Sequence, residues 1–394
     1  MLPQKHLHYI DARLQQVKVN DTVFGGIIVV LIGDLAQLPP VKAVSLSDPH
    51  QRRSSGNKDV ATLLGRSLWT EQFRTVIKLE QNKRLDEDDS DADEFNKFLE
   101  DLADGKVTMV QWEKVQTTCS RHTLKDRIWV ERGFTNESTT HLFRTNADVQ
   151  KKNYAEIQRL GRPILKVEAT NSPSIARKRR PDYFQQVVNH EYYTVNSKVL
   201  LTKNLKPELG LANGTTGKVM DIVWKEGITD EDISNASNLF IWVDFGNNYT
   251  RETFFADFPE RKDWFPVFAY ECTNFEMNKT GTGSTPLSRT MLPLKLSWAW
   301  TIHKAQGQTI PGSIVLQLGS DEMTAGLSYV GFSRCIKFSS IGIDGGLSAN
   351  RLVAKISEKP SLKARLVADA KLDKRATKTE ENLRTIINNN RRRR

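Results

Sequence analysis

Apolar residues follow two different periods along the chain, and together these periods predict an α/β architecture. Helical spacing of apolar residues predicts helices over residues 2–17, 59–73, 95–102, 146–160 and 327–332, with Asn146 as the N-cap of the fourth. Strands, most of them unbroken apolar runs, are predicted over residues 27–32, 75–79, 139–143, 294–302 and 313–318. Unbroken runs are typical of strands covered on both faces of a parallel sheet. Because strand, turn and helix recur, we predict a doubly wound α/β layer.

The stretch FGGIIVVLIGDLAQLPPV, residues 24–41, predicts a buried strand that ends in a polar site. Gly33 permits a sharp turn, and Asp34 and Gln37 are the first polar side chains beyond the strand. Ligands of open α/β sheets lie past the carboxyl ends of such strands. The amide of Gln37 could donate to a phosphate oxygen and accept from a water. An ordinary strand end with a polar turn is the alternative.

Four other regions differ in texture from these strands and helices. Short alternating runs from Lys198 onward predict a β-rich part, with a small barrel of about five strands. The acidic run at residues 86–94 predicts a solvated loop, with a metal site as the weaker alternative. The basic cluster at residues 177–184 could lie along a phosphate backbone or be solvated. Beyond Ser357, the charged tail predicts a frayed helix or a disordered extension.

Charge and cysteine content narrow the class of protein. The chain has 394 residues and 57 Lys plus Arg against 47 Asp plus Glu, a formal net charge of +10, which favours a polyanionic partner. Three widely spaced cysteines form neither a disulfide framework nor a metal cluster, as expected in a reducing compartment. The N-terminal residues lack a signal core, and the apolar runs are too short to span a bilayer, so secretion and membrane insertion are not expected.

Two further segments carry residue types that bind nucleotides and nucleic acids. In PLKLSWAWTIHKAQGQT, residues 293–309, tryptophans, hydroxyls, His303, Lys304 and Gly307 converge at one strand end. Such a set could stack an unpaired base and neutralise a phosphate, although burial of both tryptophans in the core is the alternative. In GLSYVGFSRC, residues 326–335, Arg334 could deliver a guanidinium to a phosphate.

Six segments, taken in order, resemble the later motifs of superfamily 1 5′-to-3′ DNA helicases of the petite-integration-frequency (Pif) and RecD type. They are GDLAQLPPV, LEQNKRL, HLFRTNADVQKKN, GLANGTTGKV, PLKLSWAWTIHKAQGQT and GLSYVGFSRC, and the similarity covers about residues 1–345. The resemblance implies RecA-like P-loop NTPase lobes with an inserted SH3-like β-barrel. It implies a partial first lobe at 1–70, a second lobe at 71–204 and 291–356, the barrel at 205–290, and a basic tail at 357–394.

The same resemblance implies roles for individual residues. The implied nucleotide-binding residues are Gly33, Asp34, Gln37, Arg84, Gln306, Gly307 and Arg334. Among them Gln37 would couple the nucleotide state to strand movement, and Arg84 and Arg334 would contact phosphate during catalysis. The residues implied to contact single-stranded DNA are Thr145, Asn146, Asn213, Thr301, His303 and Lys304.

The chain departs from the family pattern at the sites that bind ATP and Mg²⁺ in the complete enzyme. The P-loop, GxxxxGK[ST], and the strand that ends in Asp-Glu should both precede the first helix, and neither occurs in the sequence. At residues 214–218, GTTGK resembles a P-loop only superficially, because Ala212 replaces the first glycine and a strand follows. At residues 316–322, LQLGSDE is a poor match to the metal-binding strand end. Binding of ATP by this chain alone is therefore in doubt.

Two functions from different classes follow. The first is ATP-dependent 5′-to-3′ translocation on single-stranded DNA with strand separation, of which this chain would be an incomplete and inactive part. The second is a non-catalytic remnant that binds single-stranded nucleic acid, possibly from a mobile element. A protein-interaction module that uses the acidic loop and the basic tail is a weaker third. The resemblance implies an intracellular protein of DNA repair, recombination or telomere maintenance, and the RRRR terminus could be a nuclear address.

Overall fold

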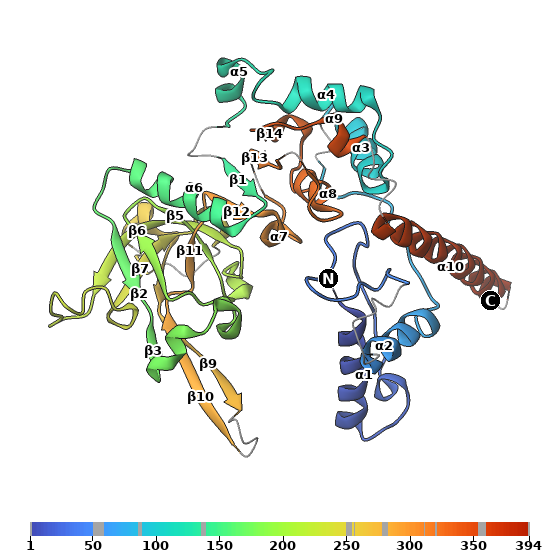
Figure 1. The fold of residues 1–394 in the computed structure, drawn as a ribbon, viewed down its shortest axis with the longest axis horizontal. Coiled ribbons are helices and arrows are strands. Elements are labelled where there is room, and N and C mark those ends of the chain that lie inside the picture. Colours follow the sequence, from blue (N-terminus) through green and yellow to red (C-terminus); the bar gives the residue numbers. More distant parts are fainter. Residues whose placement is uncertain are drawn as a thin grey trace. The chain divides into compact units, whose positions relative to one another are not determined.

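The computed structural model describes residues 2–49, 59–85, 89–134, 139–249, 254–255, 257–277, 283–310, 312–319, 321–353 and 360–392. The chain forms two compact units (Figure 1). Unit 1 comprises Met1–Arg144 together with Ile302–Arg394, and unit 2 comprises Thr145–Thr301. The predicted acidic loop lies partly outside the described residues, because residues 86–88 are not among them.

Unit 1 combines helices with a parallel sheet. The helices found among its described residues are α1 Gln4–Lys18, α2 Val60–Glu71, α3 Ala92–Asp104, α4 Met109–Cys119, α5 Asp126–Glu131, α7 Ile302–Ala305, α8 Leu327–Phe332, α9 Ala349–Leu352 and α10 Pro360–Arg392. The central parallel strands are β1 Thr140–Phe143, β13 Ile314–Gln317 and β14 Ile341–Ile343. Strand β13 lies between the other two, and Ile314 pairs with Thr140 on one side and Ile341 on the other. The predicted strands at 139–143 and 313–318 are therefore confirmed.

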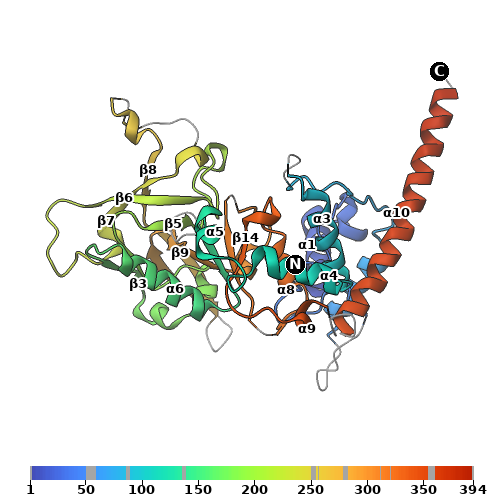
Figure 2. The ribbon, with the colours of Figure 1, turned by 90° about the horizontal axis from the view of Figure 1, so that it is seen from above.

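Helix α3 shows how the apolar spacing positions an element of unit 1. The four apolar side chains that predicted it, Phe95, Phe98, Leu99 and Leu102, are all buried, and Gly105 ends the helix in a left-handed conformation with φ of 68°. Helices α3 and α8 lie side by side (Figure 2). The ring of Phe98 meets Phe332 of α8 edge-on, with 5.2 Å between centroids. This aromatic contact fixes α3 against the helix that precedes Arg334.

The buried strand predicted over residues 27–32 is wrong. These residues form no strand, and Ile28, Val30 and Ile32 are 91%, 74% and 90% exposed. The alternate side chains Val29 and Leu31 pack on a cluster made by α1 and α2. One side of the run is therefore covered, while no described strand pairs with its backbone. Residues 29 and 31 thus have apolar partners in helices, and residues 27–32 belong to none of the sheets formed by the described residues.

The strand predicted over residues 75–79 is also wrong, and the tail explains part of the difference. Ile77 and Leu79 are 75% and 85% exposed in a segment without regular secondary structure. The backbone N–H of Val76 donates to the hydroxyl of Thr379 in α10 at 3.2 Å. The tail is thus one helix of 33 residues that contacts this segment, in agreement with the helical alternative for the tail.

Unit 2 is rich in antiparallel strands. It contains the helix α6 Asn146–Arg159 and the strands β2 Leu165–Glu168, β3 Thr170–Ser172, β4 His190–Tyr193, β5 Lys198–Leu201, β6 Thr216–Trp224, β7 Leu239–Asp244, β8 Trp264–Phe268, β9 Tyr270–Met277, β10 Ser284–Met291, β11 Leu294–Leu296 and β12 Ala299–Thr301. Five strands form one sheet in the order β11-β5-β6-β7-β8. The hairpin β9-β10 pairs with β3 through β10.

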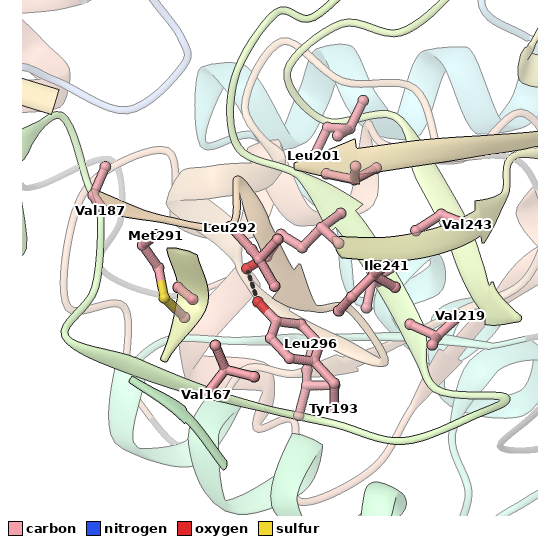
Figure 3. Close-up of a cluster of buried hydrophobic side chains, with 14 of the residues drawn as sticks. Val167, Val187, Tyr193, Leu201, Val219, Ile241, Val243, Met291, Leu292 and Leu296 are labelled. Atoms are coloured by element: carbon pink, nitrogen blue, oxygen red, sulfur yellow. Dashed lines mark hydrogen bonds between the residues drawn. The ribbon is translucent and has the colours of Figure 1, made fainter. Parts of the chain in front are cut away.

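A single apolar core holds unit 2 together. Leu201, Val219, Ile241 and Val243 from the five-stranded sheet are buried in it (Figure 3). The hydroxyl of Tyr193 donates to the carbonyl of Leu294 at 2.9 Å, so this buried polar group is satisfied inside the core (Figure 3). Alternation along β7, in which Leu239, Ile241 and Val243 face inward, is the pattern that predicted a β-rich part from the sequence.

Three details of unit 2 differ from expectation. The run 294–302 is divided into β11, β12 and the start of α7 rather than one strand. Helix α6 is capped by Thr145, whose side chain accepts from the N–H of Asp148, and Asn146, expected to be the cap, is the first helical residue. The five-stranded sheet recruits β5 and β11, which lie outside the predicted barrel at 205–290. Closure of these strands into an SH3-like barrel stays a prediction.

Two general properties follow from the described residues. Among them, no helix is both long enough and apolar enough to cross a bilayer. Cys119, Cys272 and Cys335 are all free thiols and all buried. Burial raises the pKa of the Cys119 thiol to about 12, so this thiol stays protonated and behaves as a small apolar side chain.

Candidate functional site

The loop that follows residues 27–32 is folded around the carboxylate of Asp34. One oxygen of this carboxylate accepts from the backbone N–H of Ala36 at 2.8 Å, and the other accepts from the Gln37 amide at 3.3 Å. The hydroxyl of Tyr329, in α8, donates to the second oxygen at 2.9 Å. Asp34 therefore joins the loop that carries Gln37 to the helix that precedes Arg334.

Close packing of this loop on α8 requires a glycine at position 326. Gly326 has φ of 85°, a left-handed conformation that side chains disfavour. A Cβ atom at this position would lie 2.5 Å from the carbonyl oxygen of Ala36 and 3.2 Å from the carbonyl of Gln37. The missing side chain lets the two backbones approach, so the glycine sets the position of Gln37.

We expect Gly326→Ala to loosen this contact and to lower the free energy of unfolding by about 2 kcal/mol, from backbone strain and the contact with Ala36. Hydrogen exchange of residues 34–38 should accelerate, and urea unfolding should give the loss in stability. Gly346→Ala is the matched control, because its Cβ would meet nothing within 4 Å. Equal exchange in both variants would show that Gly326 does not position the loop.

Two amides from distant parts of the sequence meet at this loop. The side chain of Gln306, which follows α7, donates to the side-chain oxygen of Gln37 at 3.2 Å. Gly307 is the next residue, with φ of 82° and open space around its Cα. Gln37 and Gln306 are therefore brought together as the sequence predicted, and Gly33 begins the same loop. The remaining amide N–H groups of such a pair can serve oxygen acceptors.

Arg334 lies deep in unit 1, with 1% of its surface exposed. Its guanidinium donates to the carbonyls of Val330, Ala305 and Gln308 at 2.9, 3.4 and 3.0 Å, and to the hydroxyl of Ser333 at 2.7 Å. The group thus ties α7, the loop after it, and α8 together. Burial, followed by the nearby charge of Arg84, lowers the pKa of Arg334 to about 10. In this structure its donors are used by the protein itself.

Arg84 lies beside Arg334 and is less buried. Its guanidinium donates to the carbonyl of Ser333 at 2.9 Å and to the hydroxyl of Thr309 at 3.0 Å. Both guanidinium groups therefore bond to Ser333, Arg84 to its carbonyl and Arg334 to its hydroxyl, and the nearby charge of Arg84 contributes to the lowered pKa of Arg334. The negative charge of Asp34 favours the charged form of Arg334, but its effect on the pKa is smaller than that of burial and of Arg84. An arrangement of two cations and two amides is chemically suited to an anion with several oxygens.

The residues predicted to contact single-stranded DNA are divided between the units. His303 and Lys304 are exposed residues of α7 in unit 1, whereas Thr145, Asn146, Asn213 and Thr301 belong to unit 2. Burial lowers the pKa of His303 from its usual value, so its imidazole is mostly neutral at pH 7. Trp298 and Trp300, 5% and 6% exposed, are both in the core. Neither tryptophan therefore offers a stacking platform for a base.

The site also contains residues that the sequence did not single out. Tyr329 and Gly326 hold the Asp34 loop, and both lie in the segment 326–335, which also contains Arg334. Arg351, in α9, is fully buried against Glu322 and the end of β13. The role of Tyr329 could have been inferred from the GLSYVGFSRC segment in which it lies. No motif in the sequence around Arg351 indicates a role for that residue.

The carboxylates near the site offer no ready-made cation site. Asp34 is engaged by Tyr329 and Gln37, and Glu322 is bonded to Arg351 and Ser328. No group of three metal-ligating side chains was found in the part of the chain that the structure describes. The geometry therefore fits an anion better than a divalent cation.

Comparison with known proteins was made on both sequence and fold. The PIF1-like helicase family model matches residues 1–113. The human ATP-dependent DNA helicase PIF1 is 27% identical over 330 residues, which cover 82% of this chain and 42% of the human protein. The ATP-dependent DNA helicase Pif1 of a Psychrobacter strain is 24% identical over 85% of this chain and 50% of its own length. The chain thus spans half or less of these relatives.

Solved structures show the same mixed α/β, RecA-like fold. The Pif1 helicase from Candida albicans has a TM-score of 0.68 at 19% identity and covers 94% of this chain and 74% of its own. The Bacteroides Pif1 helicase, solved in complex with ADP-AlF3 and ssDNA, has a TM-score of 0.59 at 21% identity and covers 91% of this chain and 71% of its own. These likenesses establish the fold.

Proposed function

We propose that this chain, whose residues 1–113 match the PIF1-like helicase family model, is a member of that family and acts within an ATP-driven motor that moves 5′ to 3′ along single-stranded DNA and separates strands. The observation that supports this most strongly is the convergence of Gln37, Arg84, Gln306 and Arg334. These residues are spread over nearly 300 positions of sequence, and they lie around one site in unit 1. A set of motifs with unrelated roles would have no reason to converge.

We propose that this site faces the phosphates of ATP. Bound ATP would supply the charge and the free energy of hydrolysis, and Arg84, Gln37 and Gln306 are the residues whose polar groups would hold it. The two adjacent guanidiniums fit such a group, because an anion would relieve their mutual repulsion. Asp34 and Tyr329 would keep the Gln37 loop in place. Mg²⁺ is proposed for the complete motor, in which one or two carboxylates and the phosphates of ATP would hold it.

Single-stranded DNA is the proposed track. His303 and Lys304 in unit 1, with Thr145, Asn146, Asn213 and Thr301 in unit 2, are the proposed contacts, as the motif resemblance implies. The Bacteroides relative was solved with ssDNA, which supports this choice of partner. A non-catalytic remnant is not favoured, because the relatives are named ATP-dependent DNA helicases. We also propose a nuclear site of action, for which residues 391–394 are the sequence support.

We expect the 394-residue chain to bind oligo(dT) but to show no DNA-stimulated ATP turnover, because no P-loop occurs in its sequence. Log affinity for oligo(dT) should fall steeply with log salt, at about 0.7 units of slope for each phosphate contacted. His303→Ala with Lys304→Ala should lower this affinity and the slope. Fluorescence anisotropy across a salt series and a coupled ATPase assay are the measurements.

Two results would contradict the proposal in different ways. A flat salt dependence, or no binding of oligo(dT), would remove DNA as the partner. ATP turnover by the chain alone at rates typical of the class would show that another part of this sequence binds the phosphates. Lys125→Gln is a control for the loss of a single positive charge, because Lys125 is exposed and lies directly before α5 in unit 1.

A further inference from the structure

Helix α10 is anchored to unit 1 by two arginines that each cap another helix. Arg365 donates to the carbonyl of Ala103 at 2.6 Å, at the C-terminal end of α3. Ten residues further along α10, Arg375 donates to the carbonyls of Thr70 and Phe73 at 2.7 and 2.8 Å, at the C-terminal end of α2. Cations are favourable at helix C-termini, where carbonyls lack intrahelical partners. One face of α10 is thus fixed on two other helices.

Two further contacts hold the middle of α10. Lys78 forms an ion pair with Asp373 at 2.7 Å, and the N–H of Val76 donates to Thr379. Leu362 is 5% exposed near the start of the helix. The first part of α10, up to Thr379, is therefore attached to the rest of unit 1 at several points along its length. Charged side chains on its other face are presented in a fixed arrangement.

The opposite face of α10 carries a stripe of exposed lysines. At 100° per residue, they fall within about 80° of the helix circumference, on the side away from Leu362, Arg365 and Asp369. All of them are exposed, and Glu381 is the acidic residue that shares this arc. The lysines of this stripe are Lys363, Lys371, Lys374 and Lys378. We call this face the lysine stripe.

The lysine stripe has the chemistry of a contact to the backbone of double-stranded nucleic acid. Lys371 and Lys378 are about 10 Å apart along the axis, at 1.5 Å per residue, and the held helix keeps that spacing rigid. Sites for single strands combine cations with aromatic rings on which bases stack. Residues 360–392 contain no Phe, Tyr or Trp. Lysines without aromatic residues are suited to double-stranded DNA, because the high charge density of its phosphate backbone is enough for binding without base stacking.

We propose that the lysine stripe of α10 binds the phosphate backbone of duplex DNA, at a site separate from the motif residues His303 and Lys304. The choice of DNA as the polyanion rests on the proposed function, while the stripe itself rests on charge and geometry. Because Arg375 and Thr379 attach α10 to residues 70–76, duplex bound on the outer face also steadies the segment that leads to Arg84. This contact lies outside the segments that resemble helicase motifs.

The test compares two triple variants of the full chain that remove equal charge. Lys371→Gln, Lys374→Gln and Lys378→Gln together should weaken binding of a blunt 20-base-pair duplex about tenfold or more near 0.1 M salt, and reduce the salt slope by roughly 2 to 3. Binding of oligo(dT) should change much less. The control is Lys125→Gln, Lys225→Gln and Lys262→Gln, three exposed lysines elsewhere in the chain. Thermal unfolding should be unchanged in both, because every substituted side chain is exposed.

Each result supports the proposal or overturns it. Equal losses in the two triple variants would attribute duplex binding to net charge and overturn it, as would an unchanged duplex affinity or a wild-type chain that does not bind duplex. A larger loss for oligo(dT) than for duplex would identify a single strand as the occupant and overturn it too. If duplex binding depends on the lysine stripe but oligo(dT) is not bound at all, the proposed function fails while this site stands.

Discussion

Replacing Arg334 with alanine should lower the free energy of unfolding by about 3 kcal/mol or more, before any nucleotide is present. The guanidinium donates to the carbonyls of Val330, Ala305 and Gln308, and its removal breaks all three bonds. The carbonyls of Val330 and Ala305 keep the Ser333 hydroxyl and the Gln308 N–H as donors, whereas that of Gln308 loses the donor that the structure shows for it. Each hydrogen bond from a charged donor contributes about 1.5–3 kcal/mol, so the loss of several bonds accounts for the expected effect. Urea unfolding of the chain, followed by circular dichroism, measures the loss.

Arg84→Ala is the matched control for this variant. Arg84 also makes two hydrogen bonds at the site, but it is more exposed, so we expect a loss of only about 1 kcal/mol. In a complete motor, a loss of ATP turnover in Arg334→Ala would therefore have two causes, a missing phosphate contact and a displaced α8, whereas Arg84→Ala would remove a phosphate contact with little loss of stability. Wild-type stability in Arg334→Ala would contradict the structural role, and the residue would then be free to act on phosphate alone.

The success of sequence reasoning on helices, and its failure on two strands, have the same physical origin. In an amphipathic helix such as α3, the spacing of the apolar residues identifies the buried face, and Phe95, Phe98, Leu99 and Leu102 are buried as predicted. A strand needs partners that its own residues do not specify. Residues 27–32 carry the hydrophobicity of a sheet interior, yet Ile28 and Ile32 are exposed because no described strand covers them. The spacing of apolar residues along a segment predicts a helix or a strand, but the elements that pack against the segment determine whether it is buried.

The candidate site could be predicted in membership but not in detail. Motif order brought Gln37, Arg84, Gln306 and Arg334 into one expected site, and the structure places them together. The sequence could not show that the Arg334 guanidinium faces backbone carbonyls, because carbonyl positions depend on how α7 and α8 pack. Nor could it show that Asp34 accepts from Tyr329, a contact that spans 295 positions of the chain.

Arg351 is the largest omission from the sequence reasoning, and Arg351→Ala should lower the free energy of unfolding by about 3–5 kcal/mol. Its side chain is 0% exposed and forms an ion pair with Glu322 at 2.8 Å. It also donates to the carbonyls of Leu318 and Asp321 at 2.6 Å each, at the end of β13. Removing the arginine would leave the buried Glu322 carboxylate without its counter-ion and would break the hydrogen bonds to the carbonyls of Leu318 and Asp321, and removal of one partner is the most unfavourable way to break a buried pair.

The consequence should extend to the candidate site, because Glu322 also accepts from Ser328 in α8. Arg351→Ala should therefore raise hydrogen exchange at residues 34–38 as well as lower stability, since α8 carries Tyr329. Arg127→Ala is the control: its ion pair with Glu131 is 87% and 55% exposed, and its loss should not be measurable. Arg351→Met with Glu322→Gln should recover part of the stability by removing both buried charges. If the double variant is no more stable than Arg351→Ala, the lost carbonyl contacts and not the ion pair hold β13 and α8 together.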